Sequence, residues 1–532
     1  MNKIVSIFLK YFLLIAFAFL FEITFSSITL FSLFNVFENT FFALALICPI
    51  SLFNGKKIKT YYFNFSFIFF SILLFFETIY FYLFKTYFSS SAIFVALDSN
   101  ANESKEFLNF YIDPTIIVFT VVFCLIVFYA LFKSRYLFQD IYHQKKYNSL
   151  KVFVLFFGII LFVRQSTLIR FNLPYLVLKS SIEYNAESEK LGDYRNNKLG
   201  DFKDVSRSSN TDEDEVYVVV IGESTARSHL GIYDYYRQTT PKLENLKDEL
   251  LIYKDVLSPH AYSVGALTKK LTLGNYEAPN RISDGSIIQL INSVGFETYW
   301  ISNQRPIGPY ESMITKISLS SKKHNFITTT LAGNSTVLDG ELLKEYDEIL
   351  REQNSKKVIF VHMMGTHHQY ENRYPESFKI FKDEPNTNFK SKESFKKINH
   401  YDNAILYNDF IISEIIKKLD NLNKKSFVLY FSDHGEEMYR DLDMAGHNED
   451  IYSKQMFEIP MFLWQSEKYK KTKKIYFVED RKYMTDDLFH ALADLLNISA
   501  IEVELSRSIF SKEFNERKRI IKDTIDYDKF FK

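Results

Sequence analysis

The chain contains 532 residues, more than the ~250–300 residues at which a single hydrophobic core usually stops growing, so at least two structural units are expected. Its 64 lysine and arginine residues balance 64 aspartate and glutamate residues, and this zero net charge argues against the concentrated basic face that a nucleic-acid partner requires. Phe, Leu, Ile and Tyr dominate the first third, whereas the remainder mixes polar and apolar residues. We therefore predict a transmembrane domain at 1–170, an interfacial helix and linker at 171–215, and a soluble domain at 216–532.

Five apolar segments are predicted to cross a membrane as helices, because each is close to the ~20 residues that span a bilayer. They are residues 4–25, 30–53, 60–84, 112–132 and 149–168. Glu38 and Asn39 interrupt the second segment, and an interfacial loop or a re-entrant segment is the alternative there. Glu77 lies inside the third, where a buried ionisable group is either functional or packed near one end of the helix.

Basic residues set the orientation of these segments. They are concentrated at 56–59, between the second and third segments, and at 133–146, between the fourth and fifth. The positive-inside rule places both loops in the cytoplasm, so after five crossings the carboxyl-terminal domain lies outside that membrane. No small-residue cleavage site follows the first segment, which we therefore interpret as an anchor. Cys48 and Cys124 fall in predicted spans, so the exported domain uses no disulfides.

Three polar stretches adjoin the apolar segments. Residues 89–110 are polar enough to lie outside the membrane, and Asn100 and Glu103 within them are candidates for binding substrate. Residues 172–185 have the amphipathic pattern of a helix that lies along the membrane interface. Residues 186–215 resemble a linker without a packed core, and the acidic run at its end is expected to be solvated.

The soluble domain alternates apolar strands with helical patterns. Strands are predicted near 216–222, 297–302, 357–363, 426–432 and 459–464, and helices near 264–273, 284–293, 338–352 and 403–419. This alternation is typical of a mostly parallel sheet with helices on both faces. The domain contains neither of the glycine-rich phosphate-binding motifs GxGxxG and GxxxxGK followed by Ser or Thr.

Reactive side chains follow four of the predicted strands. They are Glu223 after the first, Asn303 after the second, His367 after the third, and Asp433 and His434 after the fourth. Each alone is better explained as a helix cap or a packing group. Together they favour a metal site, because the carboxyl ends of parallel strands lie along one edge of a sheet. Carboxylates combined with imidazole suit zinc, with manganese as the alternative, and Asn303 is a candidate for contacting substrate.

Ser263 is the predicted nucleophile. Pro259 disfavours a helix before it, and apolar residues recur after it at helical spacing, at Val264, Leu267 and Leu271. The hydroxyl is therefore expected at a helix amino terminus, where unpaired amides and the dipole stabilise an oxyanion and a phosphoryl group. By itself this serine is better explained as an N-cap, but beside a metal ion its hydroxyl can ionise and attack.

Ten of the eleven histidines lie in the predicted exported domain. His367, in HMMGTHHQY, and His447, in MAGHNED, stand in loops next to the predicted metal site. Their imidazoles are expected to hold phosphate oxygens and to protonate a leaving alkoxide, so both are predicted to be catalytic. The histidines predicted to be structural are His229, His260, His362 and His490.

Several motifs together resemble the phosphoethanolamine transferases of Gram-negative bacteria, which are membrane members of the alkaline phosphatase and sulfatase superfamily. The matching text is VVVIGESTARSHLGIYDYYRQTTPKL at 218–243, SPHAYS at 258–263, FVHMMGTHHQYENRYP at 360–375, YDNAILYND at 401–409, FSDHGEE at 431–437 and GHNED at 446–450. The predicted spans and the polar loop after the third also resemble this family. The resemblance therefore covers nearly the whole chain and implies an α/β alkaline-phosphatase-like domain after the transmembrane helices.

The resemblance also implies roles for individual residues. It assigns zinc to Glu223, Ser263, Asp433 and His434, and contacts with the phosphoethanolamine group to His367 and His447. The chain departs from the family's pattern in two ways: the nucleophile is usually threonine where Ser263 stands, and many members have disulfides in the exported domain. The text is most similar to the subgroup that modifies heptose of the lipopolysaccharide core, although lipid A is the alternative acceptor.

The function implied is a two-step transfer. Phosphoethanolamine moves from phosphatidylethanolamine to lipopolysaccharide or lipooligosaccharide through a covalent phosphoserine, at the bacterial inner membrane with the catalytic domain in the periplasm. A phosphoglycerol transferase and a sulfatase or phosphodiesterase of the same superfamily are the nearest alternatives. A transporter with an exported sensor domain is the alternative from another class.

Overall fold

The computed structural model describes most of the chain. The described stretches are 2–53, 55–88, 92–93, 96–97, 104–105, 108, 111–134, 138, 149–190, 194–208, 213–304, 313–327 and 337–532. They belong to two compact units: a helical unit, Met1–Leu97 with Leu108–Tyr184, and an α/β unit that contains Asn185–Lys532. Asn100 and Glu103, the predicted substrate contacts in the polar loop, lie outside the described residues.

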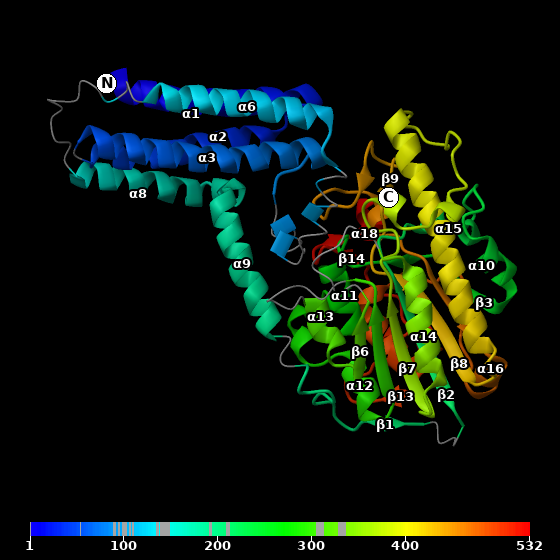
Figure 1. Cartoon of the computed structure of the whole chain (residues 1–532). Helices are drawn as coiled ribbons and strands as arrows, with labels where there is room; N and C mark the ends of the chain where they lie inside the picture. Colours follow the sequence, from blue (N-terminus) through cyan, green and yellow to red (C-terminus); the bar gives the residue numbers. More distant parts are fainter. Residues whose placement is uncertain are drawn as a thin grey trace. The chain divides into compact units, whose positions relative to one another are not determined.

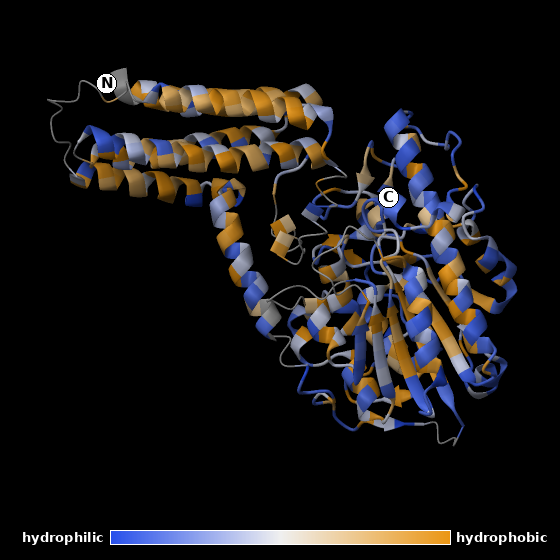
Figure 2. Cartoon of the chain, viewed as in Figure 1, coloured by the Kyte–Doolittle hydropathy of each residue, from blue (hydrophilic) through white to orange (hydrophobic). Residues whose placement is uncertain are grey.

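The helical unit consists of long helices, which are apolar except for α9, where polar and apolar residues are mixed (Figures 1 and 2). They are α1 (Asn2–Phe25), α2 (Leu30–Ile47), α3 (Lys56–Phe84), α6 (Pro114–Phe132), α8 (Ser149–Gln165) and α9 (Leu173–Lys190), the last of which extends beyond the unit. Among the described residues, α1, α2 with the turn after it, α3 and α6 are the four helices long and apolar enough to cross a membrane. α8, the fifth predicted span, has 17 residues, so its crossing stays a prediction.

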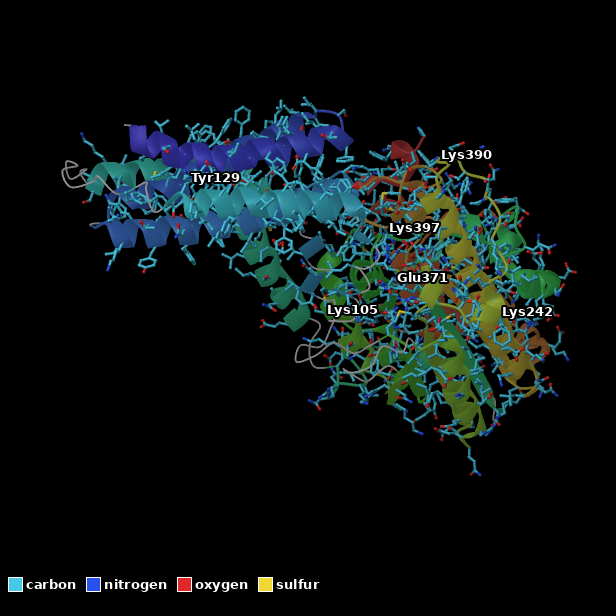
Figure 3. All side chains as sticks on the ribbon, turned by 45° about the horizontal axis from the view of Figure 1, so that its top comes forward. Lys105, Tyr129, Lys242, Glu371, Lys390 and Lys397 are labelled. Atoms are coloured by element: carbon cyan, nitrogen blue, oxygen red, sulfur yellow. The ribbon has the colours of Figure 1, made fainter. Side chains whose placement is uncertain are left out.

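The two units differ in what they expose. Large apolar side chains such as Phe65, Leu125 and Phe128 are exposed on the helical unit. On the α/β unit, charged side chains such as Lys242 and Glu371 lie on the outside (Figure 3). An apolar exterior of this extent is unfavourable in water, so the helical unit is suited to a lipid environment.

Glu38 and Glu77 are buried inside the helical unit, at 1% and 5% exposure. Glu38 Oε1 accepts a hydrogen bond from Asn172 Nδ2 at 2.7 Å, and Glu77 Oε2 accepts one from Asn39 Nδ2 at 2.9 Å. Amide donors therefore partner the polar groups that interrupt the second and third predicted spans, as polar groups in an apolar interior require. With these bonds in place, α2 continues as one helix through Glu38 and Asn39.

A seven-stranded sheet forms the centre of the α/β unit, which confirms the predicted fold class. Its strands, in spatial order, are β3 (Leu250–Tyr253), β11 (Met461–Gln465), β8 (Lys425–Ser432), β2 (Glu215–Gly222), β7 (Lys356–His362), β5 (Glu297–Ser302) and β6 (Lys323–Phe326). The helices of this unit are α10 (Pro241–Asn245), α11 (Ser263–Leu271), α12 (Ile287–Ser293), α13 (Met313–Ser318), α14 (Leu342–Arg351), α15 (Lys392–Asp420), α16 (Glu467–Thr472), α17 (Leu488–Leu495) and α18 (Tyr527–Phe530). Five of the seven strands were predicted; β3 and β6 were not.

β2 is the central strand and sets the register of the site. It pairs in parallel with β7 on one side and β8 on the other, with Ile221 opposite His362 and Gly222 opposite Ser432. Every residue of β2 is buried, so both faces of the sheet are covered, and this explains the continuous apolar run in the sequence. The three strands end level with one another, so the residues that follow them leave the sheet at the same edge.

β11 runs antiparallel to both of its neighbours, whereas it was predicted among the strands of a mostly parallel sheet. The segment between β8 and β11 remains at the edge where β8 ends, since Met461 at the start of β11 pairs with Phe431 near the end of β8. The chain therefore re-enters the sheet from the carboxyl-terminal edge and runs in the opposite direction. The sheet remains mostly parallel.

The stretch before β2 is packed on the α/β unit, which differs from the predicted linker. Tyr194 is buried and donates a hydrogen bond to Ile282 O at 3.1 Å. β1 (Ser206–Arg207) pairs with β13 (Ile498–Ser499). The expectation that the whole acidic run is solvated is wrong for Glu215, which is fully buried and bonded to Arg207. The predicted domain boundaries at 170 and 215 stay predictions, as does the placement of α9 along a membrane interface.

Candidate active site

Glu223, Asp433 and His434 converge at the carboxyl-terminal edge of the sheet. One ligand atom from each lies within 4.8 Å of the others, and none of the three side chains is more than 1% exposed. Glu223 directly follows β2, and the other two directly follow β8, the parallel neighbour of β2. The structure therefore brings together residues that are more than two hundred positions apart, as expected for ends of adjacent parallel strands.

Asp433 has one oxygen in use and one without a partner. Its Oδ1 accepts hydrogen bonds from Ser224 N at 2.9 Å and His434 N at 2.7 Å. Its Oδ2 is buried and has no hydrogen-bond partner among the described residues. A buried carboxylate oxygen without a donor is unfavourable unless a cation contacts it. This orphaned oxygen, beside a second carboxylate and an imidazole, fits a divalent cation.

The ring of His434 is oriented to offer a nitrogen lone pair to this cluster. Its Nδ1 lies 2.8 Å from Gly435 O, a carbonyl that only an N–H can donate to, so Nε2 is free to act as a ligand. Nε2 lies 3.6 Å from Glu223 Oε1 and 3.5 Å from Asp433 Oδ2. Burial lowers the pKa of His434 to about 4, which keeps the imidazole neutral at pH 7, as metal ligation requires.

Glu223 is held by two side chains. Ser224 Oγ donates to its Oε1, and Gln304 Nε2 donates to its Oε2, each at 2.8 Å. Burial, followed by the neighbouring charge of Asp433, raises the pKa of Glu223 well above its ordinary value. A bound cation would offset the repulsion between the two carboxylates, since it attracts the charged form of both.

The affinity of the cluster for a divalent cation is expected to fall as the pH is lowered. Because the pKa of Glu223 is raised, this carboxylate takes up a proton at a higher pH than the ~4.3 of an unperturbed glutamate, and the proton competes with the cation. Titration calorimetry with zinc between pH 5 and 8 should show weaker binding at the acidic end. Affinity that does not change over this range would contradict the assignment of Glu223 as a ligand.

Ser263 places its hydroxyl against the same cluster. It is the first residue of α11, and Tyr262 occupies the N-cap position, so capping does not explain the serine. Ser263 Oγ lies 3.3 Å from Glu223 Oε2 and 3.5 Å from His434 Nε2. The hydroxyl is therefore close enough to share a cation with the carboxylates, at a helix amino terminus that favours negative charge.

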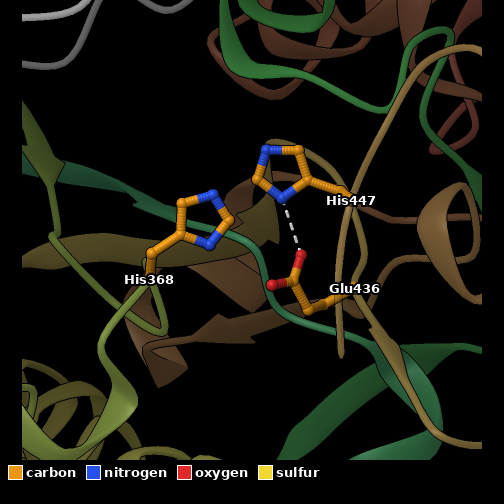
Figure 4. A group of neighbouring side chains, drawn as sticks. All are labelled: His368, Glu436 and His447. Carbon is orange, nitrogen blue, oxygen red and sulfur yellow. Dashed lines mark hydrogen bonds and ion pairs between the residues drawn. The ribbon is translucent and has the colours of Figure 1, made fainter. Parts of the chain in front are cut away.

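A second group of ligand-type residues lies beside the first. One ligand atom from each of His368, Glu436 and His447 lies within 4.8 Å of the others (Figure 4). His447 Nδ1 is 2.7 Å from Glu436 Oε2, and Tyr370 donates its hydroxyl to Glu436 Oε1 at 2.5 Å. The rings of His447 and His434 have centroids 4.2 Å apart. His447 is therefore adjacent to the first cluster, as predicted.

Neighbouring carboxylates favour the charged form of His447. Burial lowers the pKa of His447, but the charge and hydrogen bond of Glu436, together with the charges of Asp433 and Glu449, outweigh this effect, and the pKa is raised above its ordinary value. Tyr370, Glu436 and His368 were not predicted from the sequence. Glu436 follows the predicted ligands by two positions, and His368 directly follows His367, so proximity in sequence was the signal available for both.

His367 and Asn303, the other two predicted site residues that the structure describes, are not members of either cluster. The ring of His367 lies 5.0 Å from that of His368, and its buried Nδ1 has no hydrogen-bond partner among the described residues. Asn303 donates to Val337 O and to Asp339 Oδ1, each at 2.9 Å. Its role in binding substrate stays a prediction. Gln304, the next residue along the chain, provides the contact with Glu223 instead.

Comparisons with known proteins agree with this arrangement. The sulfatase family model matches residues 215–498. Phosphoethanolamine transferase EptC of Escherichia coli is 30% identical over 490 residues, which are 84% of this chain and 83% of that protein. Phosphoethanolamine transferase CptA of Salmonella typhimurium is 28% identical over 487 residues, with the same shares of the two chains.

Solved structures extend the comparison to the fold. The C-terminal periplasmic domain of EptC from Escherichia coli in complex with Zn is 33% identical, with a TM-score of 0.60, and the match covers 62% of this chain and 97% of that one. The integral membrane protein lipooligosaccharide phosphoethanolamine transferase A (EptA) from Neisseria meningitidis is 22% identical and similar in fold, with a TM-score of 0.64 over 93% of this chain and 98% of that one. The chain therefore belongs to the sulfatase family and, within it, to the phosphoethanolamine transferases.

Proposed function

We propose that this chain transfers phosphoethanolamine from phosphatidylethanolamine to lipopolysaccharide or lipooligosaccharide through a phosphoserine at Ser263. The observation that carries the proposal is the position of Ser263 Oγ. It lies within 3.5 Å of Glu223 and His434, at the carboxyl-terminal edge of the sheet. A hydroxyl beside a cation site and at a helix amino terminus is equipped to attack phosphorus. The relatives that match most of the chain are named phosphoethanolamine transferases.

Zinc is the cation that we propose. The two carboxylates, the imidazole and the orphaned Asp433 Oδ2 suit it, and a relative has been crystallised in complex with Zn. Manganese, which the sequence left open, has no support from the comparisons. Glu223, Ser263, Asp433 and His434 would hold the ion, which when bound would stabilise the ionised form of the serine hydroxyl and the charge on the phosphoryl group.

Residues in and around the cluster have separate roles in the two steps of the proposed transfer. In the first step Ser263 Oγ forms a bond to phosphorus, the bond from phosphorus to the diacylglycerol oxygen breaks, and His447 supplies the proton to that oxygen. Its raised pKa favours the protonated form that this role requires, and Glu436 fixes the ring. In the second step the now neutral His447 takes the proton of an acceptor hydroxyl, whose oxygen forms the new bond to phosphorus, and the bond to Ser263 breaks and returns the ionised serine oxygen. His367 is proposed to hold the phosphoryl oxygens.

The helical unit explains how such an enzyme meets its substrates. The proposed donor and acceptor are both lipids, and four helices suited to a bilayer keep the chain at a membrane surface. If α8 also crosses, as the sequence predicts, the positive-inside rule puts the α/β unit outside the cytoplasm. We therefore propose the bacterial inner membrane, with the α/β unit in the periplasm, as for the relative solved as a periplasmic domain.

Cells with the gene are expected to carry one more phosphoethanolamine unit on their surface glycolipid than cells without it. Mass spectrometry of the intact glycolipid measures the gain, and fragmentation assigns it to core heptose or to lipid A. We expect the core, because the sequence most resembles the subgroup that modifies core heptose, and the match to Kdo(2)-lipid A phosphoethanolamine 7''-transferase covers 48% of the chain. Identical glycolipids in both strains would contradict the proposed function, and a gain of phosphoglycerol would favour the phosphoglycerol transferase alternative.

A further inference from the structure

Lys270 is a fully buried lysine in the helix that carries the nucleophile. It is 0% exposed and lies in α11, seven residues after Ser263. Residues seven positions apart share one face of an α-helix, so both side chains point from α11 toward the edge of the sheet. Lysine is rarely buried completely, and an apolar residue would be the less costly choice at this position.

Three oxygen atoms surround the ammonium group of Lys270. Nζ donates to Ser432 O at 3.0 Å, to Ser258 Oγ at 3.2 Å, and to Asp433 O. An ammonium group has three N–H donors, so these acceptors use all of them. Ser258 Oγ also lies 2.7 Å from Asp433 O, which adds a second contact to that carbonyl.

These carbonyls belong to the residues with which β8 ends and the metal site begins. β8 ends at Ser432, and Asp433 is the first residue beyond it. Buried carbonyls that leave a sheet ladder need donors from elsewhere, and Lys270 is a donor to both. On the other side of the same residue, Ser224 N and His434 N hold the Asp433 carboxylate. The backbone and the side chain of Asp433 are thus fixed independently.

We infer that Lys270 is a positioning residue of the catalytic centre, binding the carbonyls of Ser432 and Asp433 so that the Ser263 helix and the Asp433 carboxylate keep their separation. The inference rests on the proposed function, because it assigns Asp433 and Ser263 to one cation. Lys270 touches neither the ligand atoms nor the hydroxyl directly. Its effect reaches the site through the peptide groups that it binds.

Lys357 provides a matched control. It is also 0% exposed, and its Nζ donates to the carbonyls of Ile349 and Glu352, each at 2.6 Å. It stands at the start of β7, the end of the strand that is remote from the catalytic edge. Replacing either lysine by methionine removes a buried donor of backbone carbonyls, but only Lys270 contacts the residues that lead into the site.

The test compares Lys270→Met and Lys357→Met in the full chain in detergent, using zinc as the probe. Chelator competition measures zinc affinity, and thermal unfolding with and without zinc measures stability. We expect Lys270→Met to lower zinc affinity ~10–100-fold, the effect of losing a group that orients a metal ligand. Lys357→Met should lower the unfolding temperature equally with and without zinc and leave zinc affinity unchanged. If Lys270→Met does not fold, Lys270→Gln, which keeps an N–H donor, takes its place with a smaller expected loss.

Lys270 variants that bind zinc as tightly as the unmodified chain, with only the loss of stability seen for Lys357→Met, would overturn the inference. The proposed function fails in a different way, since the unmodified chain would then bind no zinc or transfer no phosphoethanolamine. Reduced zinc affinity in Lys270→Met, together with transfer of phosphoethanolamine by the unmodified chain, supports both the role of Lys270 and the proposed function.

Discussion

Replacing Ser263 by alanine is expected to abolish the covalent intermediate and to lower the transfer rate at least ~10⁴-fold, because the substitution removes the hydroxyl that faces the cluster from the amino terminus of α11. Ser263 Oγ lies 3.3 Å from the carboxylate of Glu223 and 3.5 Å from the imidazole of His434. Incubation with phosphatidylethanolamine in the absence of acceptor, followed by intact-protein mass spectrometry, measures the adduct directly.

Two variants distinguish loss of the nucleophile from general damage. Ser263→Thr keeps a hydroxyl at the same position and is expected to retain the adduct. Ser293→Ala, at the end of α12 and outside the site, should behave as the unmodified chain does. An adduct of unchanged yield on Ser263→Ala would show that another residue is the nucleophile.

Replacing Asp433 by asparagine is expected to lower zinc affinity by more than the ~100-fold that the loss of an outer contact causes, because the substitution removes a ligand charge. Asparagine has nearly the same shape, and its carbonyl oxygen can still accept the hydrogen bonds of Ser224 N and His434 N. The fold should therefore survive while the site loses its cation. Transfer activity should fall in parallel with the zinc content. Inductively coupled plasma mass spectrometry of the purified full chain measures that content.

Asp409→Asn is the matched control for this substitution. Asp409 is also buried and also accepts two backbone hydrogen bonds, from Lys242 N at 3.0 Å and Leu243 N at 2.8 Å. Its replacement weakens the start of α10, at a cost of about 1–3 kcal/mol in the free energy of unfolding, without touching the metal site. Equal loss of zinc in both variants would mean that Asp433 acts only through stability.

The position of the site could be predicted because the strands that deliver it are buried on both faces. β2 and β8 are continuous apolar runs, and the ligands follow directly where each run stops. Glu223 and Asp433 therefore mark the ends of their strands in the sequence itself. Parallel pairing then brings the two ends together without further information.

The direction and number of the edge strands could not be predicted in the same way. β3 and β6 have four residues each, and β6 is largely exposed, so neither produces a long apolar run. The direction of β11 depends on the path of the segment between β8 and β11, which folds back along the catalytic edge. No local pattern in β11 records that path.

The supporting side chains of the site were missed for a related reason. Asn303 and Gln304 are neighbours at the end of β5, and successive side chains of an extended segment point to opposite sides. The sequence alone does not show which of the two faces Glu223, and the structure shows that Gln304 does. Tyr370 begins a 3₁₀ helix of three residues and Glu436 lies in a loop, and in such short segments a side chain's direction is set by tertiary packing and not by a repeating pattern.

The shared cation site is tested most directly by anomalous diffraction at the zinc absorption edge from crystals of the zinc-loaded protein. We predict an anomalous peak bounded by Glu223, Asp433 and His434, with Ser263 Oγ beside it. Crystals of the Asp433→Asn variant should lose that peak. Zinc-loaded crystals of the unmodified chain without a peak between these residues would contradict the proposal that the sheet edge holds one cation against the nucleophile.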